Sequence, residues 1–140
     1  MARILIVDDD AHTVRIMSLW LTRQGHEIIE ARDGQIALNL LESSQDPIDL
    51  IVSDVNMPAV NGLELLRRVR EELELNMPFL MLSSRCDQTA LTREIKPYWA
   101  HLYPKPFVPS RLVVEIDRLL AEHHGSKMQT LKVGECDIER

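Results

Sequence analysis

The sequence predicts an α/β domain built on a five-stranded parallel sheet with helices on both faces. Short, almost wholly apolar runs recur along the chain, for example at residues 4–7 and 79–82, and each has the length of a buried strand. Segments with helical periodicity separate these runs. An alternation of strands and helices favours a parallel sheet whose crossovers are right-handed.

Length and composition limit the possible functions. The chain has 140 residues, which favours one domain, and its formal net charge of -6, without any block of Lys or Arg, argues against binding to nucleic acid or to an anionic membrane. We therefore expect protein partners. Cys86 and Cys136 have neither metal-ligand nor CxxC spacing, and no apolar segment resembles a signal peptide or a membrane span. These features predict a cytoplasmic protein with reduced thiols.

The first half of the chain begins with a strand at residues 3–7 that stops at the acids of residues 8–10. The following helix should end at Gly25. Its predicted inward residues are Thr13, Ile16, Met17, Trp20 and Leu21, and its predicted outward residues are His12, Arg15, Leu19 and Arg23. A short strand at residues 27–31 comes next. A second helix then opens at Asp33-Gly34 and turns Ala37, Leu38 and Leu41 inward.

The central stretch, residues 49–62, places a carboxylate at the end of a buried strand. A short apolar run ends at Asp54, and a Met57-Pro58 turn leads to the next helix. Asn61 and Glu64 have the spacing of a capping box. The apolar stripe predicted for that helix is Leu63, Leu66, Val69 and Leu73.

The second half predicts one more internal strand, one edge strand and two helices. The strand at residues 79–82 is followed by Ser83 and Ser84, and the helix at residues 87–96 is expected to be the least stable element because its apolar face is small. Pro104 restricts the last strand, residues 101–105, to a sheet edge. The final helix should start near Pro109 and end before Gly125, with Leu112, Val113, Ile116, Leu119 and Leu120 inward.

Five polar side chains stand at the predicted strand ends: Asp8, Asp9, Asp54, Ser83 and Lys105. Because parallel strands end at the same edge of a sheet, we expect these groups to meet. They suit phosphoryl transfer to an aspartate, with Asp54 as the nucleophile, Asp9 as a second metal ligand, and Lys105 and the metal neutralising the phosphoryl oxygens. Ser83 would donate a hydrogen bond. Oxygen ligands alone favour Mg²⁺.

The sequence resembles the receiver domain of bacterial two-component response regulators, from residue 2 to about residue 124. The motifs are Ile-Leu-Ile-Val-Asp-Asp at residues 4–9, Asp-Val-Asn-Met-Pro at 54–58, Gly62, Ser83 at a strand end, and Lys-Pro-Phe at 105–107. The resemblance implies a flavodoxin-like doubly wound sheet with strand order 2-1-3-4-5. It also implies a stand-alone receiver at residues 1–124 and a short tail at 125–140 without an output domain.

The resemblance also implies a role for each site residue. Asp54 would be phosphorylated by a histidine kinase or a histidine phosphotransfer protein. Mg²⁺ would be held by Asp9, Asp54 and the backbone carbonyl of Asn56, with support from Asp8, while Ser83 and Lys105 would sense the phosphoryl group. The protein would then act on a downstream protein as a monomer or weak dimer. It would not be an enzyme beyond slow loss of its own phosphoryl group, which Asn56 and Arg85 are placed to influence. The peptide bond before Pro106 is expected to be cis.

The chain departs from the family pattern on the output side. Leu102 stands where Tyr or Phe is usual, and Ser84 replaces a small apolar residue. Tyr98 and Trp99 lie in a loop that is usually rich in Gly and Ala, so these two aromatic residues either cover the last strand or serve as an interface. These departures leave open a second interpretation, in which the chain is a protein-contact module that signals without phosphorylation.

A third interpretation is a phosphatase of the haloacid dehalogenase kind, since residues 8–10 also read as Asp-x-Asp. Such an enzyme would use Asp8 as the nucleophile and Asp10 as the acid/base. The Gly-Thr that usually follows this motif is replaced by Ala11-His12, and the interpretation leaves Asp54 without a role. Asp10 is better explained as the N-cap of the first helix. Replacing Asp54 or Asp10 by Asn distinguishes the two hypotheses.

Overall fold

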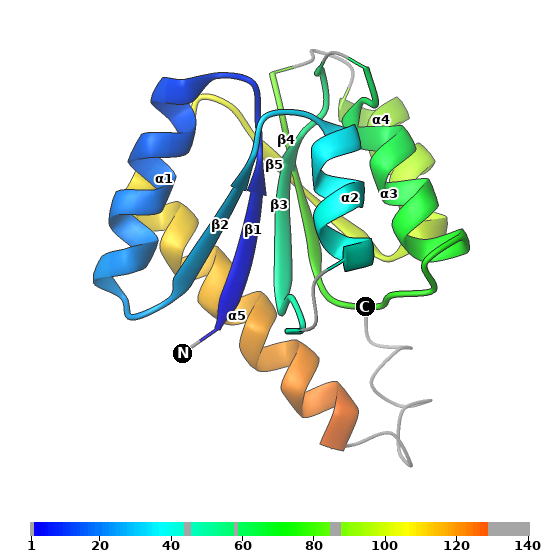
Figure 1. Ribbon diagram of the computed structural model, residues 1–140. Helices are drawn as coiled ribbons and strands as arrows, with labels where there is room; N and C mark the ends of the chain where they lie inside the picture. Colours follow the sequence, from blue (N-terminus) through cyan, green and yellow to red (C-terminus); the bar gives the residue numbers. More distant parts are fainter. Residues whose placement is uncertain (1, 44–45, 58, 85–87, 129–140) are drawn as a thin grey trace.

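The computed structural model describes residues 2–43, 46–57, 59–84 and 88–128, and side chains as far as residue 123. Five strands alternate with five α-helices and one 3₁₀ helix (Figure 1). The elements are β1 (Arg3–Val7), α1 (Ala11–Arg23), β2 (Glu27–Ala31), α2 (Gly34–Ser43), β3 (Leu50–Asp54), α3 (Gly62–Glu71), β4 (Phe79–Ser83), α4 (Gln88–Ile95), the 3₁₀ helix η1 (Lys96–Tyr98), β5 (Ala100–Pro104) and α5 (Pro109–Met128).

All five strands are parallel and lie in the order β2-β1-β3-β4-β5, which confirms the predicted doubly wound sheet. β5 pairs with β4 at one edge, and it begins one residue earlier than expected. Pro104 is its last residue. The proline therefore occupies the edge position that its missing N–H group requires.

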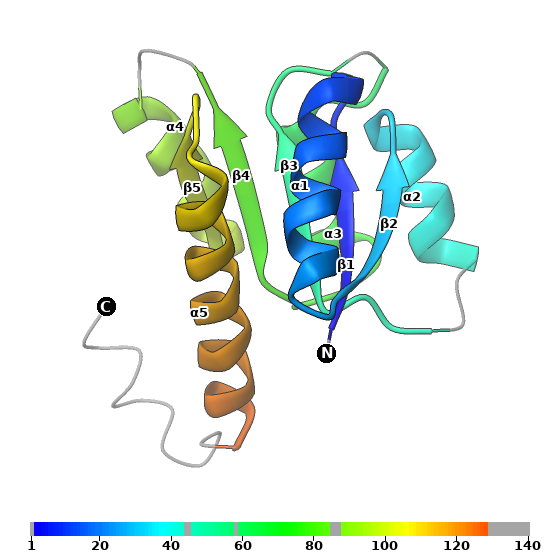
Figure 2. The same cartoon turned by 90° about the vertical axis from the view of Figure 1, so that its left-hand side faces the viewer.

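Helices cover the sheet on both faces. Figure 2 shows α1 and α5 together on one side, and α2, α3 and α4 lie on the other. Successive residues of β1 alternate between the two cores: Ile4 and Ile6 pack with α1 and α5, whereas Leu5 and Val7 pack with α2, α3 and α4. Because both faces of the inner strands are buried, those strands are apolar throughout rather than alternating.

The inward face of α1 differs from the prediction. Val14, Met17 and Leu21 are the buried residues, while Ile16 is only half-buried. Met17 and Leu21 were predicted to face inward, and they are buried. Val14 was not predicted, because it is one of several neighbouring apolar residues that the sequence pattern alone did not distinguish. Trp20 is half-buried and packs against the core on the α1 and α5 side, in agreement with its assignment to the core.

The end of α1 follows the prediction at Gly25. The backbone N–H of Gly25 donates to the carbonyl of Thr22 (2.9 Å), and that of His26 donates to the carbonyl of Leu21 (3.2 Å). Gly25 has φ +91°, a left-handed conformation that L-residues with a side chain adopt at a cost.

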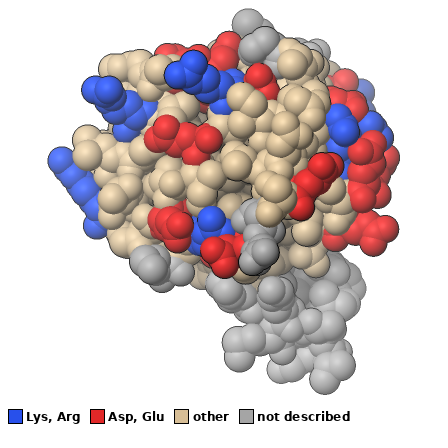
Figure 3. Space-filling model, viewed as in Figure 1, with Lys and Arg blue, Asp and Glu red and all other residues tan. Residues whose placement is uncertain are grey.

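Helix α3 starts with half of the predicted capping box. The side chain of Asn61 accepts a hydrogen bond from the backbone N–H of Glu64 (2.9 Å). The carboxylate of Glu64 instead binds Arg67 (2.6 Å), which also pairs with Glu71 (3.1 Å). Figure 3 shows acidic and basic side chains interleaved on the α3 side of the molecule. Leu65, which the predicted apolar stripe omitted, is fully buried.

Helix α5 packs all five predicted residues inward, but it is longer than predicted. It continues through Gly125 to Met128. Glycine lowers helix propensity by about 1 kcal/mol relative to Ala, yet it ends a helix only where the backbone turns left-handed. None of the helices that the structure describes is both long and apolar enough to cross a membrane.

Candidate functional site

The carboxyl ends of β1, β3 and β5 bring together the groups that the sequence predicted would meet. The Nζ of Lys105 lies 3.1 Å from Oδ1 of Asp54 and 3.3 Å from Oδ2 of Asp8. In the sheet, Val7 is paired with Ser53, so Asp8 and Asp54 occupy equivalent positions at the carboxyl ends of the neighbouring strands β1 and β3. One cation thus bridges two carboxylates from strands far apart in the sequence.

A third carboxylate completes this cluster. Asp8, Asp9 and Asp54 each offer an oxygen, and these oxygens lie within 4.8 Å of one another. Asp8 is buried, Asp54 is half-buried and Asp9 is exposed, so the cluster opens toward solvent. Three carboxylates, without nitrogen or sulfur among them, form a donor set that suits a hard divalent cation such as Mg²⁺.

The electrostatics of the cluster couple Asp8 to Lys105. Burial raises the pKa of the Asp8 carboxyl, and a hydrogen bond from the backbone N–H of Asp10 (2.9 Å) together with Lys105 offsets only part of this effect. Burial also opposes the charge on Lys105, but the hydrogen bond to Asp54 and the attraction of both carboxylates outweigh it, so the pKa of Lys105 is raised. Lys105 is therefore charged at neutral pH, and burial opposes the charged form of Asp8.

Ser83 and Asn56 lie at the same edge of the sheet. Ser83 is the buried last residue of β4, and its carbonyl accepts a hydrogen bond from the backbone N–H of Lys105 (2.9 Å). The peptide bond between Lys105 and Pro106 is cis, as the sequence predicted. Asn56 is exposed in the loop two residues after Asp54. Residues 58 and 85–87, among them Pro58, Arg85 and Cys86, lie outside the described residues, as does Cys136.

Gly62 allows α3 to begin directly against the site. Its backbone N–H donates to the carbonyl of Val55 (2.8 Å). A Cβ atom at this position would stand 2.2 Å from the carbonyl oxygen of Asp54, which is far inside van der Waals contact. Only glycine therefore fits at this point of the motif, because it lets the start of α3 lie against the backbone of Asp54.

Asp10 has the capping role that the sequence predicted. Its side chain accepts hydrogen bonds from the backbone N–H of His12 (3.0 Å) and from the hydroxyl of Thr13 (2.8 Å). The hydrogen bond from Thr13, followed by that from His12, lowers the pKa of this carboxyl. The third aspartate of the run thus stabilises the start of α1.

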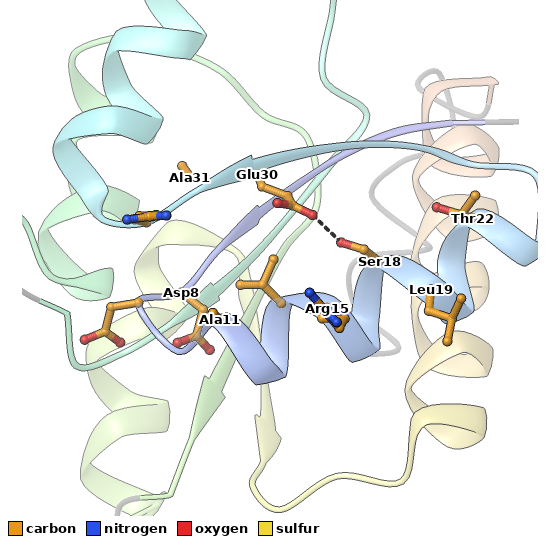
Figure 4. A pocket seen from close by; sticks show the side chains of 11 residues that line it. Asp8, Ala11, Arg15, Ser18, Leu19, Thr22, Glu30 and Ala31 are labelled. Carbon is orange, nitrogen blue, oxygen red and sulfur yellow. Dashed lines mark hydrogen bonds between the residues drawn. The ribbon is translucent and has the colours of Figure 1, made fainter.

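A cavity of about 740 Å³ lies beside the carboxylate cluster, between α1 and β2 (Figure 4). Asp8 and Asp9 line one end of it, and Ser18 donates a hydrogen bond to Glu30 (2.8 Å) across it. Leu19 also lines the cavity, and half of its surface is exposed. The outer face of α1 is therefore open next to the cluster.

Arg70 is a buried residue that sequence reasoning missed. It is only 8% exposed, its Nε donates to the carbonyl of Tyr98 (2.7 Å) and its Nη1 donates to that of Leu75 (2.9 Å). Burial lowers the pKa of its guanidinium to about 10. The helical spacing could have indicated this burial, because Arg70 is four residues after the buried Leu66 and so lies on the same face of α3.

The two aromatic residues before β5 have different environments. Tyr98 is half-buried, and its hydroxyl donates to Glu71 (2.8 Å). Trp99 is 68% exposed, and its ring lies 5.6 Å from the guanidinium of Arg70. The interpretation that both rings cover the last strand is therefore wrong for Trp99.

Comparison with known proteins gives the same assignment as the geometry. Residues 4–117 match the response regulator receiver domain family. The chain is 33% identical over 125 residues to a chemotaxis protein CheY homolog of Campylobacter jejuni, covering 88% of this chain and 95% of the relative. It is 34% identical over 129 residues to the transcriptional regulatory protein CpxR of Escherichia coli K12, covering 92% of this chain but only 53% of CpxR.

Solved structures agree with these relatives. The chemotaxis response regulator CheY4 of Vibrio cholerae has a TM-score of 0.77 and 33% identity, covering 85% of this chain and 98% of CheY4. The family match extends from β1 into α5 and includes every element that contributes to the carboxylate cluster. The chain therefore belongs to the response regulator receiver domain family, with the CheY-type fold.

Proposed function

We propose that this protein is a phosphoacceptor in a two-component or phosphorelay pathway, and that Asp54 receives the phosphoryl group. The donor would be a phosphohistidine of a sensor kinase or of a histidine phosphotransfer protein. The observation that supports this most directly is the bridge from Lys105 to Asp54 and Asp8, next to the exposed Asp9. A carboxylate beside a cation at the open end of a strand is within reach of a donor.

In the proposed step, a carboxylate oxygen of Asp54 attacks the phosphorus atom. A P–O bond forms while the P–N bond of the phosphohistidine breaks, and the leaving imidazole keeps the electron pair. Lys105, already 3.1 Å from Asp54, neutralises charge on the phosphoryl oxygens. Ser83, at the end of the neighbouring strand β4, donates a hydrogen bond to one of them.

Asp8, Asp9 and Asp54 fit a Mg²⁺ ion, and the backbone carbonyl of Asn56 is the further ligand that we propose. These residues would hold the ion where its positive charge would help to neutralise the phosphoryl oxygens. Asp8 also binds the backbone N–H of Asp10 and Lys105, so it orients the cluster as well as adding charge.

Residues 1–124 would act as the receiver and residues 125–140 as a short tail. The protein would be cytoplasmic, would act through a downstream protein rather than through nucleic acid, and would be a monomer or weak dimer. Slow loss of the phosphoryl group to water would be its own reaction.

Titration with Mg²⁺ and then with beryllofluoride, a stand-in for the phosphoryl group, tests this proposal. We expect both ligands to bind the wild type, with amide NMR shifts spreading from Asp54 and Lys105 to the region of Trp99. Asp54→Asn should lose beryllofluoride binding, whereas Asp10→Asn, the matched control at the α1 cap, should keep it. Loss in Asp10→Asn alone would contradict the proposal and favour the phosphatase hypothesis.

The same titration addresses the protein-contact module. Leu102 is half-buried and packs against the core on the α2, α3 and α4 side, in the position where the family usually has an aromatic ring. Binding of beryllofluoride without any shift beyond the carboxylate cluster would show a phosphoacceptor whose surface does not respond. The absence of binding in the wild type would refute the phosphoacceptor role and leave the contact module.

A further inference from the structure

A second cavity, of about 900 Å³, lies at the opposite end of the sheet from Asp54. It follows the outer edge of β5 and is flanked by α4 and α5; Figure 2 shows these two helices beside β5. Its apolar wall includes Ile95, Leu102 and Leu119. β5 pairs with β4 on one side only, so among the described residues its other edge faces this groove. We call this cavity the β5 groove.

The β5 groove is lined by two cationic side chains in an acidic protein. They are Arg70 and Lys96, and the neutral imidazole of His101 lies beside them. Glu122 is the one acid among the described lining residues, and it forms an ion pair with Arg118. The whole chain has a formal net charge of -6, whereas the described lining of this groove has two cationic side chains and one acid that is already paired. Such a groove favours an acidic occupant.

Arg70 and Trp99 form the floor and rim of the groove. The two hydrogen-bond partners that the structure gives Arg70 are backbone carbonyls, and neither carries a charge that balances the guanidinium. Trp99 lies over this guanidinium while most of its own surface is exposed. An arginine and a tryptophan that are fixed side by side are typical anchors of a binding surface.

We propose that residues 129–140 of the same chain bind in the β5 groove, with Glu135, Asp137 and Glu139 facing its cationic side. The three acids alternate with Cys136 and Ile138, so in an extended segment the acids lie on one side and the other two residues on the opposite side. This pattern matches a groove at an open strand edge that has a cationic floor and an apolar wall.

Residues 129–140 follow directly after α5, so they have only a short distance to span to reach the β5 groove. Residues 119, 122 and 123 of α5 line the groove, and Met128, where α5 ends, is five residues after His123, a rise of about 8 Å. The twelve residues that follow reach roughly 40 Å when extended. This length is sufficient to turn and to pass along β5. The proposal is independent of Asp54, because the groove lies at the other end of the sheet.

A nitroxide attached to Cys136 of the full chain, with Cys86→Ser to leave one thiol, tests the proposal. The indole N–H signal of Trp99 should be broadened severalfold more than that of Trp20, which lies on α1. A free nitroxide added to protein without an attached nitroxide measures the broadening that solvent exposure alone causes at each indole. Reversing the tail charges (E135K, D137K and E139K together) should remove the difference. K96E should weaken it, whereas R23E, a matched reversal at the far end of α1, should not.

Three results would overturn the proposal. The first is equal broadening of the Trp99 and Trp20 signals relative to the free-nitroxide baseline. The second is broadening of Trp99 that persists unchanged in both the tail reversal and K96E. The third is broadening in a mixture of two kinds of chain, one carrying the nitroxide but no isotope label and the other carrying the isotope label but no nitroxide. The tail of one molecule would then bind to a second copy of the protein. Asp54→Asn should leave the broadening unchanged, which separates this proposal from the phosphoacceptor role.

Discussion

The Asp8→Asn substitution should make the metal-free protein more stable at neutral pH. Asp8 is 2% exposed, and its carboxylate shares Lys105 with Asp54. Asn keeps the shape of the side chain, and its amide oxygen can still accept the hydrogen bond from the backbone N–H of Asp10 (2.9 Å). The charge is lost, and with it the cost of burying a carboxylate beside a second carboxylate.

The pH dependence of this effect has a definite sign. The pKa of Asp8 is raised in the folded protein above the value of 3.8, first of all by burial, so the folded state holds this proton more tightly than the unfolded state. Stability is therefore lost as pH rises from about 3.8 through the folded pKa. The advantage of Asp8→Asn should be absent in acid and should grow as pH rises toward neutral.

The size of the gain should be that of a typical single stabilising change, about 1 kcal/mol. For a domain of this length it corresponds to a rise in Tm of roughly 4 °C. Mg²⁺ should reverse the order: at a hundredfold excess over its Kd, a ligand of the folded state adds about 2.7 kcal/mol. The wild type should gain this stabilisation, and Asp8→Asn should gain much less.

Thermal unfolding of both proteins in EDTA and in Mg²⁺, from acid to neutral pH, measures these differences. Asp10→Asn is the matched control. Its carboxyl has a lowered pKa because Thr13 and His12 donate hydrogen bonds to it, so removal of that charge should lower Tm at pH 7 and should not change the Mg²⁺ response. A lower Tm for Asp8→Asn than for the wild type in EDTA at pH 7 would refute the reasoning, as would equal Mg²⁺ stabilisation of the two proteins.

Two further predictions concern the backbone beside the site and the other end of the sheet. Gly62→Ala should cost about 1–3 kcal/mol in urea unfolding and should weaken Mg²⁺ binding, because its Cβ would displace the Asp54 carbonyl. Gly25→Ala, where only φ +91° opposes a side chain, should cost roughly 1 kcal/mol and leave Mg²⁺ binding intact. Burial, followed by the charge of Arg118, lowers the pKa of His101, so the wild type should lose stability as pH falls below about 6.5. His101→Gln should flatten the urea midpoint between about pH 7 and pH 5, and an unchanged slope would count against a buried neutral imidazole.

Strand positions and the carboxylate cluster were predictable because they depend on local and repeated rules. A strand that is buried on both faces must be apolar throughout, and its polar end is therefore visible in the sequence, as at Asp8 and Asp54. Parallel strands of similar length then bring those ends together without further information. The parallel sheet and the meeting of polar groups at one edge follow from these two rules, whereas the strand order 2-1-3-4-5 was expected from the resemblance to receiver domains.

Other features depend on tertiary contacts that a linear pattern does not contain. Val14 faces the sheet instead of Ile16, because the choice among neighbouring apolar residues depends on how α1 sits against α5. Arg70 is accommodated at a buried position by hydrogen bonds to the carbonyls of Tyr98 and Leu75, which are contacts from other segments of the chain. Trp99 is mostly exposed and residue 99 adopts a left-handed conformation, with φ 58°, neither of which an aromatic pattern predicts.

The contacts around Leu102 restrict how the carboxylate cluster can influence the rest of the surface. An aliphatic side chain has no ring to rotate inward, and the segment before β5 is fixed separately, through Arg70 to the carbonyl of Tyr98 and through Glu71 to its hydroxyl. β5 is also held at its other end, where the N–H of Lys105 donates to Ser83. A displacement of Lys105 toward a phosphoryl group would therefore act on the β5 backbone and its pairing with β4. Residues 100–102 of that same strand line the β5 groove, so a displacement of β5 would also change the wall of this groove.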